Sequence, residues 1–403
     1  LDLKILSKHC KYTESLRPRA RFPAAVSLPR VMRALQSVWA LQSALLCVIT
    51  ASLVAAAASA AAATAPTLLW KVGAGANGTK SDPVLSADRG SLYIGLNDGR
   101  VVAFNAMNGV ILWSFQTGME VFAGPTLSHD GSLLFIGSGD SYEYCLVASS
   151  GARVWASKTN GSVFSNPTLS PDGVTIYTGS ADGHVYAFNA KSGALQWQTA
   201  LPFPQPVASA SVISPDGRML YCGCHDGVVY AIDTTARGRI VWRHATGAEV
   251  QSDQVLSSDG RVLYIGSDDA NVYALAASSG SVLWRSKTLG KVRSGLTLNE
   301  DESTLFFGSF GGKIWSLNAA SGATRWTLET KGEVGSKPAL TADETLLFQG
   351  SFDGNVYAVE AATGEKVWAW PTGGEVHSDP CVDSERRVVF GASYAGIMFA
   401  LQY

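Results

Sequence analysis

The side chains that could do chemistry in this chain are few and scattered. Six cysteines lie at irregular spacings, and the closest two are Cys222 and Cys224. Residues two apart on a β-strand share a face, so this pair could supply half of a tetrahedral metal site. The sequence holds no second pair, so we expect no metal site and no disulfide framework, and we assign both thiols to buried packing.

Catalytic and nucleic-acid-binding patterns are also missing from the sequence. His377 has no serine or cysteine nucleophile recognisably tied to it, so the sequence does not support a hydrolytic triad. The chain carries 31 Lys and Arg against 33 Asp and Glu, a net charge of -2. Nucleic-acid binding rests on clustered basic residues, so we predict no nucleic-acid partner. Because no catalytic pattern is recognisable, we also predict no catalytic residues.

A tryptophan ladder shows which elements must position any functional residue. Its intervals are 42 to 45 residues, and its members are Trp70, Trp113, Trp155, Trp197, Trp242, Trp284, Trp326 and Trp368. A period near 42 residues that runs to the end of the chain is typical of a four-stranded propeller blade. Turn signals within the units, such as Asp182-Gly183, are those of tight hairpins. The length from Trp70 to Tyr403 accommodates about eight such units.

The ends of the repeat region predict how the ring closes. No three strands precede Trp70, and the last unit, 376–403, lacks a terminal tryptophan strand. Pairing residues 68–72 with the last unit would complete it and remove the open sheet edges. The predicted fold class is therefore all-β, an eight-bladed β-propeller of four-stranded antiparallel blades, closed by pairing of the N-terminal strand with the C-terminal blade, over residues 67–403.

The repeat resembles one propeller family in particular. The pattern GS-x-DG-x-VYA-x-(N/D)-A-x-(S/T)-G-x-x-x-W occurs at Gly179 to Trp197 and, with Glu360 at the (N/D) position, at Gly350 to Trp368. It resembles the pyrroloquinoline-quinone (PQQ)-like repeats, and the form is closest to the non-catalytic BamB-like propellers. WD-repeat propellers have a similar period, but their tryptophan closes the third strand. The resemblance implies that the eight ladder tryptophans form a docking motif between blades.

The same family contains enzymes and scaffolds. Its quinoprotein dehydrogenases hold PQQ and calcium above the channel, with an Asp as the base, and they carry long insertions. In this chain the blades are uniform except for three extra residues between Trp197 and Trp242. We therefore predict a non-catalytic protein-interaction scaffold that needs no cofactor. A PQQ- and calcium-dependent oxidoreductase and a lumenal ligand-binding or sensor module are the alternatives.

The predicted binding site is the polar mouth of the channel. The innermost strand of each blade should face the channel, and in seven repeats it should contain a recurrent serine: Ser81, Ser165, Ser209, Ser252, Ser294, Ser336 and Ser378. The residues that flank this position differ between repeats. A repeat varies where packing does not dictate the residue, so the flanking residues are candidates for binding a partner protein, against the alternative of solvated channel lining. They are Lys80, Asp82, Asn166, Gln251, Asp253, Arg293, Lys337, His377 and Asp379, with Phe122 and Phe164 beside them.

Residues 1–66 are predicted to be a targeting segment. Basic residues dominate 1–33, and 38–63 contain no ionisable side chain except Cys47. This order indicates a secretory signal peptide and an extracellular, lumenal or periplasmic location. An uncleaved membrane anchor over 44–63 and an organelle transit peptide are the alternatives. Asn77 and Asn160 begin N-glycosylation sequons that a eukaryotic secretory pathway could use. We expect a monomer.

Overall fold

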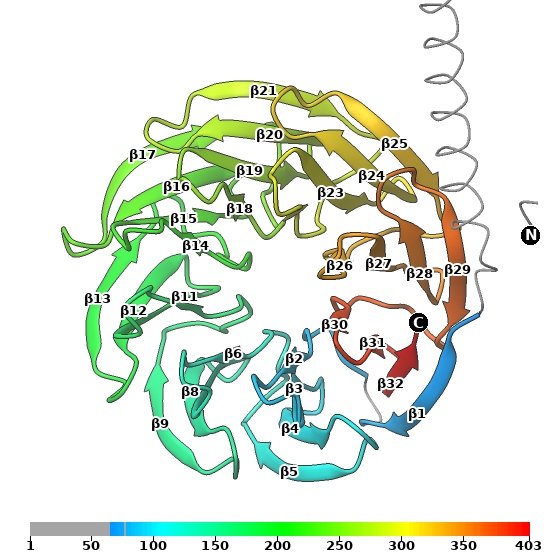
Figure 1. Ribbon diagram of the computed structural model, residues 1–403. Helices are drawn as coiled ribbons and strands as arrows, with labels where there is room; N and C mark the ends of the chain where they lie inside the picture. Colours follow the sequence, from blue (N-terminus) through cyan, green and yellow to red (C-terminus); the bar gives the residue numbers. More distant parts are fainter. Residues whose placement is uncertain (1–64, 76–77) are drawn as a thin grey trace, which may run out of the picture. The chain divides into compact units, whose positions relative to one another are not determined.

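The computed structural model describes residues 65–75 and 78–403, and these residues form a ring of four-stranded sheets (Figure 1). Eight sheets surround a central channel, and every strand pairing within them is antiparallel. The predicted eight-bladed all-β propeller is confirmed. The predicted targeting segment lies outside the described residues up to residue 64. In the part of the chain that the structure describes, no helix is long and apolar enough to cross a membrane.

Each blade runs from a short innermost strand at the channel to an outermost strand at the rim. The first four blades are blade 1, β2 (Val84–Leu85), β3 (Ser91–Gly95), β4 (Arg100–Asn105) and β5 (Ile111–Gln116); blade 2, β6 (Thr126–Leu127), β7 (Leu133–Ser138), β8 (Tyr142–Val147) and β9 (Arg153–Lys158); blade 3, β10 (Thr168–Leu169), β11 (Thr175–Gly179), β12 (His184–Asn189) and β13 (Leu195–Ala200); and blade 4, β14 (Val212–Ile213), β15 (Met219–Gly223), β16 (Val228–Asp233) and β17 (Arg239–Ala245).

The remaining blades complete the circle. They are blade 5, β18 (Val255–Leu256), β19 (Val262–Ser267), β20 (Asn271–Ala276) and β21 (Val282–Lys287); blade 6, β22 (Thr297–Leu298), β23 (Thr304–Ser309), β24 (Lys313–Asn318) and β25 (Thr324–Glu329); blade 7, β26 (Ala339–Leu340), β27 (Leu346–Gly350), β28 (Asn355–Glu360) and β29 (Lys366–Pro371); and blade 8, β30 (Cys381–Asp383), β31 (Val388–Ser393), β32 (Ile397–Gln402) and β1 (Thr67–Gly73).

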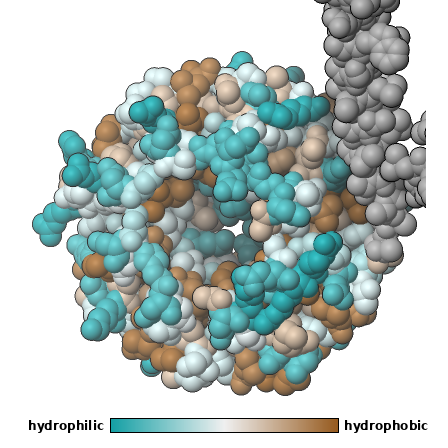
Figure 2. Space-filling model, in the orientation of Figure 1, coloured by the Kyte–Doolittle hydropathy of each residue, from teal (hydrophilic) through white to brown (hydrophobic). Residues whose placement is uncertain are grey.

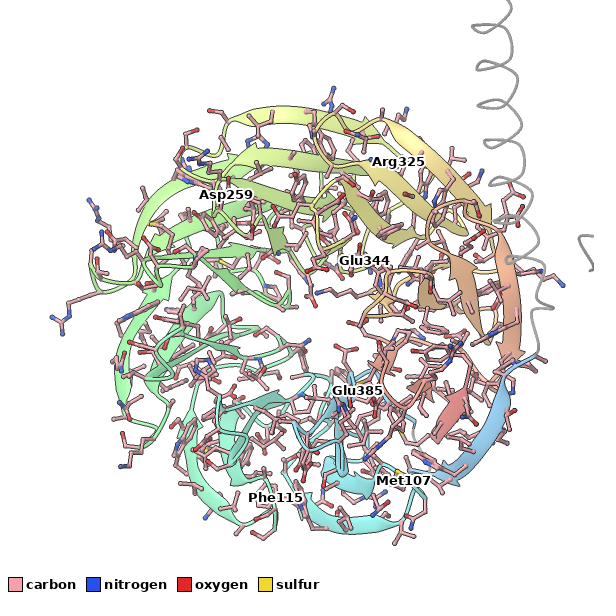
Figure 3. All side chains as sticks on the ribbon, viewed as in Figure 1. Met107, Phe115, Asp259, Arg325, Glu344 and Glu385 are labelled. Carbon is pink, nitrogen blue, oxygen red and sulfur yellow. The ribbon has the colours of Figure 1, made fainter. Side chains whose placement is uncertain are left out.

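Ring closure follows the prediction. Strand β1 pairs antiparallel with β32 from Thr67 opposite Gln402 to Gly73 opposite Ile397, so the first strand of the described residues completes the last blade. On the face that carries the turns between first and second strands, Arg89 of blade 1 also forms ion pairs with Asp383 and Glu385 of blade 8. Glu385 and Glu344 lie in such turns of the adjacent blades 8 and 7 (Figure 3).

The ladder tryptophans join neighbouring blades. Six of their indole N–H groups donate to a backbone carbonyl of the next blade at 2.8–3.0 Å, as from Trp70 to Ala106 and from Trp284 to Ala319. The glycine of the next blade's turn lies under the ring. At Gly280, for example, φ is +71° and an added Cβ would lie 2.6 Å from Trp242 Cε3. A glycine is required there because both the backbone conformation and the space exclude a side chain.

The recurrent serines do not lie where we expected. The innermost strands are two or three residues long, and each serine stands three residues before its strand. Its side chain is buried and accepts a backbone N–H from the second strand of its own blade, as Ser165 does from Gly179 at 2.8 Å. The serine thus anchors the loop that enters the blade. This anchoring leaves the residues on either side of it to line the channel.

Candidate interaction site at the channel mouth

Two sets of loops meet on one face of the propeller, which we call the mouth face. One set joins the outermost strand of a blade to the innermost strand of the next, and the other joins the second and third strands within a blade. Backbone hydrogen bonds tie the two sets together, as from Phe352 to Glu333 and from Tyr394 to Glu375. The variable residues of both sets are therefore presented together around the opening.

The residues beside the serine form two layers. Those before it lie at the mouth: Lys80, Phe122, Phe164, Ala208, Gln251, Arg293, Gly335 and His377. Those after it form an inner ring in the channel: Asp82, Gly124, Asn166, Ala210, Asp253, Gly295, Lys337 and Asp379. All nine predicted site residues belong to these two layers. The space-filling view shows the opening at the centre of the molecule (Figure 2).

Aromatic and cationic side chains contact one another in a continuous arc along the mouth. The ring centroids of Phe164 and Phe122 are 5.2 Å apart, and Lys80 Nζ lies 5.1 Å from Phe122 and 5.7 Å from Tyr394. His377 continues the arc, 5.1 Å from Tyr394 and stacked 4.0 Å from Phe352.

The arc then reaches blade 6. The rings of Phe352 and Phe310 are 5.5 Å apart, and the Arg293 guanidinium lies 5.3 Å from Phe310. The arc is therefore made of Phe164, Phe122, Lys80, Tyr394, His377, Phe352, Phe310 and Arg293, and it spans six consecutive blades from blade 3 through blade 1 to blade 6.

Two basic side chains of the arc, those of Arg293 and His377, lie against carboxylates. Arg293 Nε donates to Asp268 Oδ1 at 2.9 Å, and the Asp268 side chain is only 3% exposed. This interaction raises the pKa of Arg293 and lowers that of Asp268. His377 Nε2 lies 2.8 Å from Glu375, but burial lowers the pKa of His377 below its ordinary value. Gln251 completes this part of the mouth by donating to Glu249.

The inner ring links blades through its carboxylates and one amide. The Asp379 N–H donates to Asp82 Oδ1 at 2.8 Å, and the Lys337 N–H donates to Asp379 Oδ1 at 2.6 Å. Asn166 Nδ2 donates across the channel wall to Asp82 Oδ2 at 3.0 Å, and the Ala210 N–H donates to Asp253 Oδ1 at 2.7 Å. Three of these contacts join neighbouring blades, and the Asn166–Asp82 contact joins blade 3 to blade 1 past blade 2.

Acidic groups outnumber basic groups in this ring. The pKa values of Asp82, Asp253 and Asp379 are all raised, first because the blade walls keep the carboxyls from bulk water. Mutual repulsion raises the values of Asp82 and Asp379 further, whereas the Lys337 ammonium lowers all three. In the described ranges 65–75 and 78–403, no group of three His, Cys, Asp or Glu is placed to hold a metal ion.

Sequence reasoning missed three aromatic members of the arc. Phe310, Phe352 and Tyr394 lie in the turns between the second and third strands, at one position of the repeat pattern. That position is the variable residue after Gly-Ser in GS-x-DG, and in blade 5 it is Asp268, the partner of Arg293. The sequence therefore contained a signal for these residues, a second variable position in the repeat. That this position lies close to the variable residues beside the serine becomes visible only in the folded loops.

Comparison with known proteins decides the family. A family model described as outer membrane protein assembly factor BamB matches residues 97–236, 225–333 and 310–401. The chain belongs to this BamB family of PQQ-like repeat propellers. No curated protein sequence matches it.

Solved structures agree with this BamB-like fold. BamB from Moraxella catarrhalis is similar with a TM-score of 0.70 and 19% sequence identity, over 84% of this chain and 100% of that chain. The computationally designed Ika8 protein is similar with a TM-score of 0.72 and 13% identity, over 83% of this chain and 99% of that chain. At these identities the likeness concerns the fold alone.

One of the two predicted glycosylation sites can be placed on the BamB-like propeller. Asn160 is exposed in the mouth-face loop between β9 and β10, and Ser162 of its sequon donates to the Gly139 carbonyl at 2.9 Å. Asn77 lies outside the described residues.

Proposed function

We propose that this BamB-family propeller is a non-catalytic protein-interaction scaffold that binds a partner protein through its mouth face. The observation that carries the proposal is the arc of aromatic and cationic side chains across six blades. Aromatic residues and arginine are enriched at the centres of protein interfaces, where they supply most of the binding energy. The family's description as an assembly factor, which acts on other proteins, supports the same role.

The location proposed for this scaffold is the secretory or periplasmic space. The basic and then apolar composition of residues 1–63 supports export, and attachment to a membrane requires that this segment remain uncleaved. An exported monomeric ring whose loops face outward is suited to docking partners in that space.

The PQQ-dependent alternative does not suit the residues of the channel. PQQ is a polycarboxylate, and its binding needs cations around the quinone. The inner ring instead offers the carboxyls of Asp82, Asp253 and Asp379 with Lys337 as its one basic member. One ammonium among three carboxyls leaves the carboxylates of PQQ with few cations to bind. We propose that the chain works without a cofactor.

Site-specific crosslinking tests the proposed scaffold role. A photoreactive amino acid replaces Phe122 or Phe352 on the mouth face, or Asp216 in a turn of the opposite face as the matched control. In cells that export the chain, illumination should give discrete protein adducts from positions 122 and 352 and none from position 216.

Two results would reject the proposal. One is adduct formation from position 216 alone. The other is stoichiometric binding of PQQ and calcium to the purified chain, with oxidation of an alcohol or sugar.

A further inference from the structure

We infer that the mouth face receives an extended partner segment that carries a carboxylate, and that Lys80 is the cation to which this carboxylate binds. The inference rests on the proposed function and specifies the chemistry of the partner.

Lys80 differs from the other basic side chains of the arc, those of Arg293 and His377. Its side chain is exposed, and its ammonium is held over the rings of Phe122 and Tyr394 at 5.1 and 5.7 Å. Among residues 65–75 and 78–403, no carboxylate forms an ion pair with it, whereas Arg293 is paired with Asp268 and His377 with Glu375. Within the arc, Lys80 is therefore the cation that remains available to an anion from outside.

The aromatic neighbours of Lys80 favour a peptide over a small anion. Phe122 and Phe164 are half-buried with centroids 5.2 Å apart, so they offer a continuous apolar surface directly beside the ammonium. Tyr394, 43% exposed, bounds Lys80 on its other side. A carboxylate on Lys80 with apolar side chains on Phe122 and Phe164 would use both kinds of surface at once.

The inner ring determines how such a segment lies. Next to the mouth layer, the inner ring offers an anion three carboxyls, those of Asp82, Asp253 and Asp379, and one ammonium, that of Lys337, so it provides little to replace the water that a carboxylate would lose on entering the channel. The partner's carboxylate is therefore kept at the mouth. The segment consequently lies across the opening along the arc and does not thread through it.

Fluorescence anisotropy with defined peptides tests the inference. The probes are a short labelled peptide that alternates aspartate and leucine and its counterparts with asparagine or lysine in place of aspartate. They are titrated against the full chain, against Lys80→Met and against Lys191→Met, a matched control in an exposed turn of the opposite face. Unchanged thermal unfolding of both variants confirms that each is folded.

We expect the aspartate peptide to bind the full chain and the Lys191→Met control equally. Lys80→Met should weaken its binding by about three- to fivefold, the effect of an exposed ion pair, and high salt should reduce the difference. Equal binding of the asparagine peptide, preference for the lysine peptide, no effect of Lys80→Met, or no binding of any peptide would each overturn the inference. Mouth-face crosslinks obtained alongside such a result would leave the scaffold role standing.

Discussion

At the scale of single residues, Glu143 is the most conspicuous departure from the repeat. It lies in β8 at the position held by Val185 in β12 and Val229 in β16, and it is fully buried. Burial raises the pKa of its carboxyl to about 8, and only the neighbouring Thr178 hydroxyl lowers it. A carboxyl with a raised folded-state pKa is tolerated while protonated and destabilises the fold once ionised.

Replacing Glu143 with valine should therefore stabilise the propeller in a pH-dependent manner. Ionisation of the unfolded chain begins near the ordinary pKa of 4.5, so the wild type loses stability as pH rises from there to about 8. Glu143→Val removes this loss, and we expect a small gain near pH 5 and a gain of roughly 1–3 kcal/mol near pH 8. Urea unfolding at both pH values measures it. A gain that does not grow with pH would contradict the buried-acid explanation.

The residues of the candidate site could be predicted from the sequence, but their contacts could not. Variability beside the serine was enough to select Lys80, Asp82 and Arg293, because packing does not dictate the residues at these positions. The partners of these residues were not predictable in the same way. Arg293 contacts Asp268 and Phe310 because loops of neighbouring blades are hydrogen-bonded together, and the repeat pattern does not show which loops are bonded.

At the scale of the blade, the turn between the third and fourth strands packs its glycine against the ladder tryptophan of the preceding blade. Gly280 and Gly131 have nearly the same φ, +71° and +69°, but differ in their surroundings. An added Cβ at Gly280 would lie 2.6 Å from Trp242 Cε3, whereas at Gly131 nothing lies within 4 Å. The two positions separate backbone strain from steric collision.

Gly280→Ala should thus destabilise the propeller more than Gly131→Ala. The shared positive φ costs each variant about 1 kcal/mol, and displacement of the indole should add roughly 1–3 kcal/mol at position 280. Chemical unfolding of the two variants gives the comparison. Equal losses would show that the indole yields freely and does not fix the spacing of the blades.

The blades themselves were predictable in number, order and strand content from the sequence. The period, the Asp-Gly turns and the glycine before each tryptophan all follow from local geometry that every repeat must satisfy. The length of the innermost strand was not predictable, because Ser165 and its equivalents end strand pairing by bonding to the second strand. Serine is also common in extended segments, so its presence in the sequence does not predict that its side chain bonds to the second strand.

At the scale of the whole molecule, ring closure depends on a contact between residues far apart in the sequence. The ring centroids of Trp70 in β1 and Phe390 in β31 are 6.0 Å apart, and the Trp70 indole N–H donates to the Ala106 carbonyl of blade 1 at 2.9 Å. Trp284 makes the same donation to Ala319 at 2.9 Å between blades 5 and 6, which are joined directly by the chain. The two residues therefore have similar contacts but different connectivity.

Trp70→Ala and Trp284→Ala should each cost about 3–5 kcal/mol through lost packing. Trp70→Ala alone should also release β1, so the amides of β32 should lose protection in hydrogen exchange. The amides of β20, next to Trp284's own strand, should remain protected in Trp284→Ala. Equal loss of protection in β20 and β32 would show that closure at β1 is no weaker than any other blade junction.

The pairing of β1 with β32 also orders events during biosynthesis. Strand β1 leaves the ribosome long before its partner β32, so its hydrogen-bonding edge stays unsatisfied while the blades between them in the sequence are made. A waiting edge of this kind is a template for aggregation. If the chain is exported as proposed, translocation in an unfolded state keeps that edge from pairing prematurely, and the circle can be completed only after the final residues have crossed.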